Sequence, residues 1–109
     1  MQSFVTKARF LSLLSNEARL KILTIVSKRE ASVGDLSQKL RKSQSSVSQH
    51  LSRLREDGVV DTRREAQTIY YYCSDSRVTS ILRVLEVIFE AEGDRHENAL
   101  QQPERQEFK

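Results

Sequence analysis

The chain has 109 residues, of which 38% are hydrophobic and 30% are charged, with a net charge of +3. This balance is typical of one small globular domain. No apolar run approaches the ~20 residues that cross a bilayer, and the N-terminus has no apolar block of a signal peptide. A single cysteine excludes an internal disulfide, so we expect a cytosolic protein without a membrane partner.

Basic residues gather in one part of the chain. Residues 39–64 contain seven lysines and arginines against three acidic residues. A local basic excess suits a polyanionic partner such as nucleic acid. It equally suits an ordinary solvated surface, so the charge alone does not choose between the two.

The N-terminal third predicts two helices. Apolar residues at helical spacing indicate a helix over residues 4–14. They cover more of its surface than a lone surface helix usually carries, so part of it is expected to face a second subunit. Asn16 is a suitable N-cap for a second helix that fades near residues 28–29. Residues 31–33 are interpreted as a short extended link.

A brief third helix and a fourth over residues 44–56, capped by Ser43, follow. Val47, Leu51 and Leu54 share one face of the fourth helix. Two short helices joined by a tight link, the second polar on its outer face, indicate a helix-turn-helix. The polar face carries Ser45, Ser48, Gln49, Ser52 and Arg53.

The segment from Val59 to Cys73 is rich in β-branched and aromatic residues, which predicts two strands. Residues 64–67 are expected to form the hairpin turn. A hairpin directly after a helix-turn-helix is a wing. Its tip would bring side chains to phosphates or into the minor groove, although the same charges would also protect a hairpin edge. The expected tip residues are Arg63, Arg64, Gln67 and Thr68.

The last predicted helix covers residues 76–92, and its apolar stripe is wider than one core contact requires. We therefore expect a homodimer built from the first and last helices. The polar segment 93–109 contains the only proline and no periodicity, which predicts disorder. The expected fold is mainly α with a small β-hairpin: a winged helix-turn-helix of five helices plus the wing, in one domain over residues 1–92.

The fourth helix has the composition of a helix that reads the major groove, where short polar side chains reach base edges. A merely solvated helix would more often carry Glu and Lys there. His50 lies near the edge of the buried stripe and is expected to be a structural hydrogen-bonder more than a base reader. The predicted DNA-binding residues are Ser43, Gln44, Ser45, Ser48, Gln49, His50, Arg53, Arg63, Arg64, Gln67 and Thr68.

Four stretches carry a resemblance to a known family. They read LSNEARLKIL (14–23), SQSSVSQHLSRL (43–54), GVV (58–60) and RREAQTIYY (63–71). Together they resemble the ArsR/SmtB family of winged-helix regulators, and the last is similar to the branch of virulence regulators and nodulation repressors. The resemblance covers residues 4–92. It implies a homodimer on an imperfect inverted repeat at promoters, usually a repressor relieved by a metal or redox signal.

The sensor positions that this resemblance implies are substituted here. Ser32 and Gly34 stand where the thiolate metal site has cysteines. We therefore expect no bound metal, no cofactor and no dithiol switch. The other substituted positions are Asp75 followed by Arg77, Ile88 and Ala91 at the last-helix metal site, and Thr24 and Glu90 at the thiol switch.

Cys73 remains, and a lone cysteine is more often a small buried apolar residue than a sensor. A single-cysteine redox sensor nevertheless stays an alternative, and whether any effector exists stays open. The leading interpretation is a sequence-specific transcriptional regulator, a repressor that binds double-stranded DNA. The alternative is a winged-helix protein-interaction module without a DNA function. No enzyme is expected, because the sequence has no glycine-rich phosphate loop, nucleophile elbow or catalytic cluster.

Overall fold

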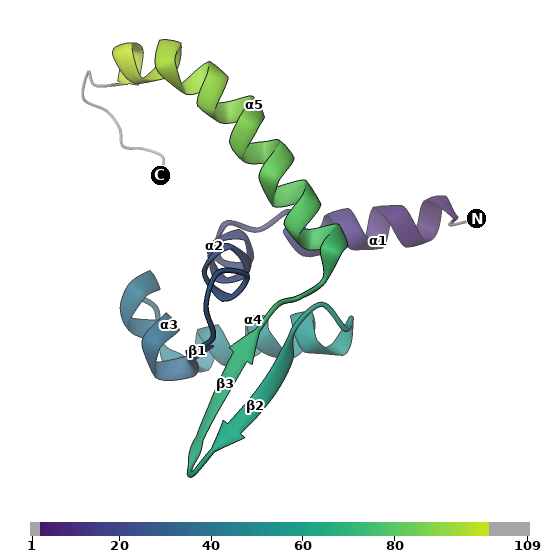
Figure 1. Ribbon diagram of the computed structural model, residues 1–109, viewed down its shortest axis with the longest axis vertical. Helices are drawn as coiled ribbons and strands as arrows, with labels where there is room; N and C mark the ends of the chain where they lie inside the picture. The colour runs from purple at the N-terminus through teal and green to yellow at the C-terminus, as the bar shows by residue number, and fades with distance from the viewer. Residues whose placement is uncertain (1–2, 101–109) are drawn as a thin grey trace. The chain divides into compact units, whose positions relative to one another are not determined.

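The computed structural model describes the backbone of residues 3–100 and the side chains of residues 3–90. The chain divides into two compact units between Val78 and Thr79. None of the helices within the described residues is long and apolar enough to span a membrane. The elements are α1 (Phe4–Leu14), α2 (Glu17–Val26), β1 (Ala31–Ser32), α3 (Val33–Leu40), α4 (Gln44–Glu56), β2 (Asp61–Glu65), β3 (Thr68–Tyr72) and α5 (Ser76–Leu100) (Figure 1).

Short polar side chains set the starts of the first helices. The side chain of Ser3 accepts a hydrogen bond from the Thr6 amide, and Asn16 accepts one from Arg19 at the start of α2. Such caps satisfy amides that have no partner inside the helix. The bounds predicted for α1, and the cap predicted for α2, are confirmed.

The fourth helix has a side-chain cap at its start and a glycine after its end. Ser43 caps it by accepting from the Ser46 amide. At the other end Gly58 takes a positive φ of 76°, and the Val59 amide donates to Leu54 O at 3.1 Å. This is a Schellman-type ending, which glycine favours because it has no Cβ. Helix α4 therefore has the bounds predicted from the sequence.

A small apolar core orients α4. Val47, Leu51 and Leu54 are at most 1% exposed, and they pack in the same core as Ile22 and Leu23 of α2, both 0% exposed. Burying each such side chain stabilises the fold by about 1.5–3 kcal/mol. Because one face of α4 is held in this core, its opposite face points to solvent.

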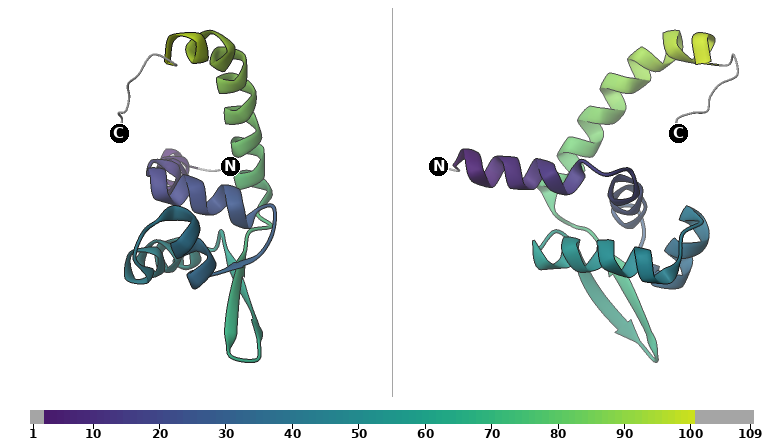
Figure 2. Two further views of the ribbon diagram at one scale, coloured as in Figure 1. Left: turned by 90° about the vertical axis from the view of Figure 1, so that its left-hand side faces the viewer. Right: turned by 180° about the vertical axis from the view of Figure 1, so that it is seen from behind.

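The sheet has three strands in the order β1-β3-β2, one more than the predicted hairpin. Ala31 pairs with Tyr71 and Ser32 with Tyr70, so the predicted extended link is the third strand. Two residues are too short to show an alternating pattern, which is why the sequence did not indicate this pairing. Both views in Figure 2 show the β2–β3 hairpin extending away from α1–α4.

The turn of the wing is shorter than expected. Strand β2 continues to Glu65, which pairs with Thr68, so only Ala66 and Gln67 form the turn. Ala66 adopts a φ of 57°. Without a glycine, the sequence did not locate the positive φ of the turn. Of the residues expected at the tip, only Gln67 lies in the turn itself; Arg63 and Arg64 are paired residues of β2 next to it, and Thr68 begins β3.

Helix α5 runs to Leu100 rather than ending near residue 92. The backbone of residues 93–100 is thus helical, and the disorder expected for residues 93–109 stays a prediction. One glycine in a helix interior costs only about 0.5–1 kcal/mol relative to alanine, whereas the first proline comes at residue 103. The remaining predicted tail, residues 101–109, lies outside the described residues.

Candidate nucleic-acid interface

The outer face of α4 is an exposed hydrogen-bonding surface of hydroxyls, amides and one arginine. Its buried stripe is formed by Val47, Leu51 and Leu54, and the opposite side carries hydroxyls and amides. No acidic residue occurs between Ser43 and Arg55. The exposed members of the predicted set on this helix and its cap are Ser43, Gln44, Ser45, Ser48, Gln49 and Arg53.

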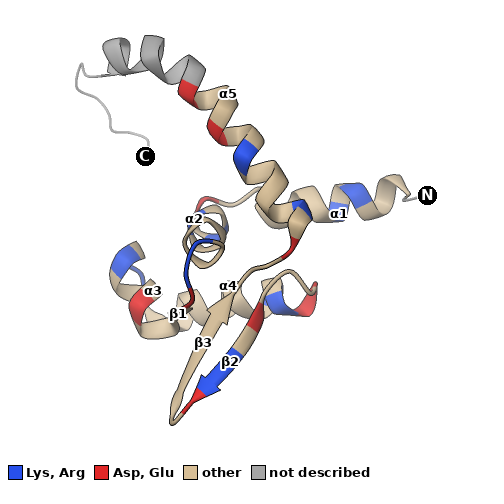
Figure 3. Cartoon of the chain, viewed as in Figure 1, with Lys and Arg blue, Asp and Glu red and all other residues tan. Residues whose placement is uncertain are grey.

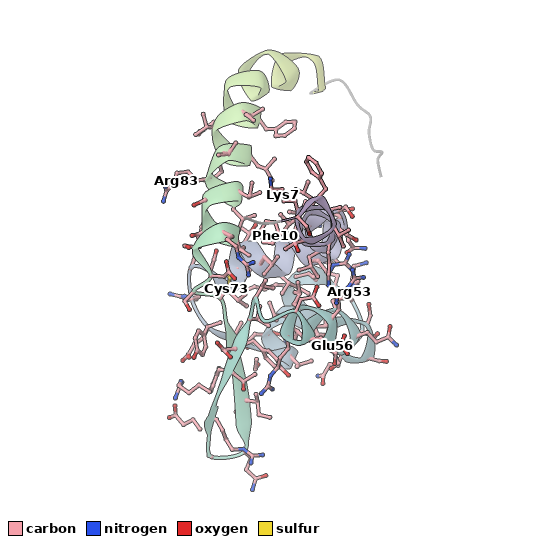
Figure 4. All side chains as sticks on the ribbon, turned by 90° about the vertical axis from the view of Figure 1, so that its right-hand side faces the viewer. Lys7, Phe10, Arg53, Glu56, Cys73 and Arg83 are labelled. Carbon is pink, nitrogen blue, oxygen red and sulfur yellow. The ribbon has the colours of Figure 1, made fainter. Side chains whose placement is uncertain are left out.

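One flank of α4 lies against the end of α1. Arg53 is exposed, and its Nη2 lies 3.4 Å from Ser12 Oγ (Figure 4). Arg19 of α2 is in the same area and donates from Nε to Leu13 O at 2.7 Å and from Nη2 to Ser12 O at 3.0 Å. Arg19 therefore stabilises the carbonyl end of α1. The sequence analysis did not identify this role, because it depends on a contact between two helices.

Arg63, predicted to contact DNA, is held by two carboxylates instead. Its Nε donates to Glu30 Oε1 at 2.9 Å and its Nη1 donates to Glu65 Oε1 at 2.8 Å. Its guanidinium lies over the Tyr70 ring, 5.0 Å from the ring centroid. The hydrogen bond from Arg63 lowers the pKa of the Glu30 carboxyl. Glu30 was missed, since nothing in its local sequence indicates a partner in the wing.

Arg64 differs from its neighbour. It is exposed, and no ion pair to it is found within residues 3–90. Gln67 and Thr68 are also exposed at the turn. Basic segments lie on β2 and at the end of α3 in Figure 3. Of the two wing arginines, Arg64 is the one whose charge is available to a polyanion.

His50 is half-buried beside the α4 core stripe. Its pKa is lowered, first by burial and then by the positive charges of Arg19 and Lys42, which favours the neutral imidazole. The structural hydrogen bond expected for His50 is not present among the side chains of residues 3–90.

Ser32, at one of the substituted sensor positions, has a structural role in this chain. Ser32 and Asp35 form a reciprocal capping box at the start of α3, with both hydrogen bonds at 3.1 Å. Within the described part of the chain, no three His, Cys, Asp or Glu side chains cluster as metal ligands. Cys73 is 6% exposed and lies near the base of the hairpin (Figure 4). Burial raises the pKa of its thiol, which disfavours the reactive thiolate.

Comparison with known proteins connects this geometry to a family. Residues 16–62, which include α2, α3 and α4, match the family model described as bacterial regulatory protein, arsR family. The transcriptional activator HlyU of Vibrio cholerae is 46% identical over 79 residues, which cover 72% of this chain and 73% of that protein. The chain belongs to the arsR family of bacterial regulatory proteins.

Other relatives of this arsR-family chain agree. The biofilm growth-associated repressor of Agrobacterium fabrum is 40% identical over 82 residues, 75% of this chain and 70% of that protein. The crystal structure of NolR from Sinorhizobium fredii superimposes with a TM-score of 0.72 at 44% identity, covering 82% of this chain and 97% of that one. The predicted winged-helix fold and family are confirmed, and the chain is a DNA-binding transcriptional regulator.

Proposed function

We propose that this arsR-family regulator is a repressor that occupies an imperfect inverted repeat in duplex DNA as a homodimer. The single observation that carries the proposal is the outer face of α4, where exposed serine and glutamine side chains stand without an acidic neighbour. Such a face can enter the major groove, because it presents hydrogen-bonding groups and no charge that repels phosphates. Its place of action would be the cytosol, where bacterial DNA lies.

Four of the predicted contact residues have distinct roles in this proposal. Gln49 is suited to bidentate pairing with adenine, and Ser48 can bond to either a base edge or a phosphate. Arg64 would hold the backbone beside the wing. Arg63 acts differently from its first assignment: its bonds to Glu30 and Glu65 make it a residue that positions the wing.

The homodimer is supported by large apolar side chains that the chain itself leaves exposed. On α1, Phe4 is 87% exposed, Val5 77% and Leu11 56%. Exposed apolar clusters of this kind mark interfaces. Pairing two copies would present two α4 helices to half-sites about 34–36 Å apart, one turn of DNA. The exposed apolar residues of α5 are Val84, Val87, Ile88 and Phe89.

Repression is the proposed sign of regulation. A dimer that covers a promoter blocks polymerase without any further surface, and one relative is named a repressor. Another is named an activator, so activation is the outcome to be tested against. We propose that binding is constitutive and is controlled by the abundance of the protein, since Ser32 and Gly34 replace ligands and Cys73 is buried.

The test is binding to duplexes followed by fluorescence anisotropy. Wild-type protein should prefer one duplex, selected from a random library or taken from upstream of its own gene, over scrambled DNA. The double variant Ser48→Ala, Gln49→Ala should lose this preference, because each good base contact contributes about 1–3 kcal/mol of discrimination. Ser80→Ala, an exposed serine on α5, is the control and should bind as wild type.

Two outcomes would contradict the proposal. Unchanged discrimination by the double variant would remove α4 as the reading element. A flat salt response with no duplex preference would indicate a protein-interaction module instead, because phosphate contacts make DNA binding steeply salt-dependent. The sign of regulation is read from a promoter reporter, where added protein should lower transcription and an increase would indicate an activator.

A further inference from the structure

A basic hollow lies beside α4, on the flank that carries His50. Its volume is about 330 Å³, and it is lined by residues from the start of α2, the end of α3 and the middle of α4. Its lining includes Lys21 of α2, Lys42 of the link between α3 and α4, and His50 of α4. The hollow is not part of the outer face described above, and none of the predicted roles uses Lys21 or Lys42 together with His50.

The charges around the hollow favour an anion. Glu17 is the one carboxylate in its lining, and Lys21 Nζ lies 3.1 Å from Glu17 Oε2. Lys42 has no ion-pair partner within residues 3–90, so its charge is uncompensated there. Arg19, on the same helix as Glu17 and Lys21, adds a further positive charge that acts on His50.

The backbone that carries Lys42 is fixed. Arg41 ends α3 in the left-handed region, with φ 57°. The Lys42 amide then donates to Ser37 O at 3.2 Å, and the Ser37 hydroxyl donates to Lys42 O. These bonds fix the backbone of Lys42, whose side chain lines the hollow.

His50 is the one group in the hollow whose charge can change near neutral pH. It is half-buried and has no hydrogen-bond partner among the described side chains. A neutral imidazole donates one N–H, whereas the protonated ring donates two. His50 also follows Gln49 directly, about 100° around the helix axis. It therefore lies beside the reading face, where the backbone of a DNA strand borders the major groove.

We propose that this hollow binds one phosphate of the DNA backbone and that His50 takes up a proton from solvent when the phosphate binds. The phosphodiester keeps its single negative charge, and the imidazole becomes imidazolium. The inference rests on the proposed function, since it assumes that α4 enters the major groove. The hollow would be a third region of DNA contact, besides the outer face of α4 and the wing. It would also make DNA affinity depend on pH.

The direction of this dependence follows from the charges. In the free protein, burial, Arg19 and Lys42 lower the pKa of His50. A phosphate between Lys42 and His50 would offset these positive charges, so the pKa of His50 rises in the complex. The complex then holds more protons than the free protein, and affinity increases as pH falls. Glu17, the one carboxylate of the lining, is paired with Lys21.

The experiment measures anisotropy with a duplex selected by the wild-type protein from a random library, at one salt concentration and between about pH 8 and about pH 6. Wild-type affinity should increase several-fold, and at most about tenfold per pH unit for each protomer. His50→Gln should bind with little pH dependence. Lys42→Gln should bind more weakly at every pH and lower the slope of log affinity against log salt by about 1 per protomer.

The matched control is Lys28→Gln, which removes the same charge from an exposed lysine after the other end of α2. Lys28→Gln should leave the DNA affinity, its pH dependence and its salt slope as in wild type. Thermal unfolding of each variant shows that the fold is kept. The ring signals of His50 in NMR spectra give its pKa in the free protein, with the selected duplex, and with inorganic phosphate alone.

The outcomes separate this inference from the proposed function. A raised His50 pKa with the duplex, absent with millimolar inorganic phosphate, supports a DNA backbone site. An equal rise with inorganic phosphate would indicate a site for the free anion and overturn the DNA assignment. Specific binding with the same pH dependence in His50→Gln would overturn the inference alone. Failure to select any duplex would overturn the proposed function and this site with it.

Discussion

Arg63 and Glu30, 33 residues apart in the chain, form a bidentate ion pair, with Nε to Oε1 at 2.9 Å and Nη2 to Oε2 at 2.5 Å. Glu30 directly precedes β1, and Arg63 lies in β2, the two outer strands of the sheet. The pair therefore spans β3 and passes over the Tyr70 ring. It ties the wing to the turn after α2.

Removing this pair should loosen the wing without unfolding the protein. In Glu30→Gln the amides of β2 and β3 should exchange with solvent faster than in wild type, while the free energy of unfolding changes little, because the pair is exposed. Hydrogen exchange followed by NMR measures the exchange rates of the wing amides and, from the most protected amides, the free energy of unfolding. The control is Glu65→Gln, which leaves the Arg63–Glu30 pair intact. Equal exchange in the two variants would contradict this role.

The same pair should weaken in acid. The Arg63 hydrogen bond lowers the pKa of the Glu30 carboxyl from its ordinary value of 4.5. A group whose folded-state pKa is lowered stabilises the fold above its unfolded pKa, and this contribution is lost as pH falls through the folded value. At neutral pH the wing amides of wild type should exchange more slowly than those of Glu30→Gln. This difference should disappear only below about pH 4.5. If the exchange rates of wild type and Glu30→Gln still differed to the same extent in strong acid, the ion pair would not be the cause of the difference.

The two wing arginines should differ in DNA binding. Arg64→Gln should weaken binding to all duplexes to a similar extent and lower the salt slope by about 1 per protomer, because one phosphate contact is lost. Arg29→Gln, which removes an exposed arginine before β1, is the control for charge alone. A loss of base preference in Arg64→Gln, with the salt slope unchanged, would instead indicate a base contact.

The dimer should depend on the apolar side of α5. Phe89 is 63% exposed, and Phe89→Glu places a charge where the proposed partner would bury an aromatic ring. Burying an unpaired carboxylate is strongly unfavourable, so this variant should be monomeric by size-exclusion chromatography with light scattering. Arg83→Glu adds a carboxylate about 120° around the same helix from Phe89, and this variant should stay dimeric. Dimers in both variants would exclude α5 from the interface.

Cys73 should react slowly with thiol reagents in the folded protein. Its side chain is buried at 6% exposure, and burial raises the pKa of the thiol from its ordinary value of 9.0. The thiolate is therefore scarce at neutral pH, and labelling should speed up only after unfolding. A disulfide-exchange reagent followed by absorbance measures this. Rapid labelling of native protein, with loss of DNA affinity that Cys73→Ser does not share, would restore the redox-sensor alternative.

Local sequence determined most of the helices in this protein. Ser43 and Gly58 mark the two ends of α4, and the spacing of Val47, Leu51 and Leu54 sets its buried face. These signals act within one or two turns of chain, so they can be read without knowing what lies nearby. The polar composition of the outer face of α4 is likewise a property of the sequence alone.

Only the tertiary structure decided which charged groups remain free for DNA. Arg63 and Arg64 are adjacent and chemically identical, yet Glu30 and Glu65 pair with the first, whereas the second has no ion pair within residues 3–90. The hollow at His50 likewise needs α2, α3 and α4 in their final places. Charges interact through space at a few ångströms. Their partners are therefore set by the folded chain rather than by neighbours in the sequence.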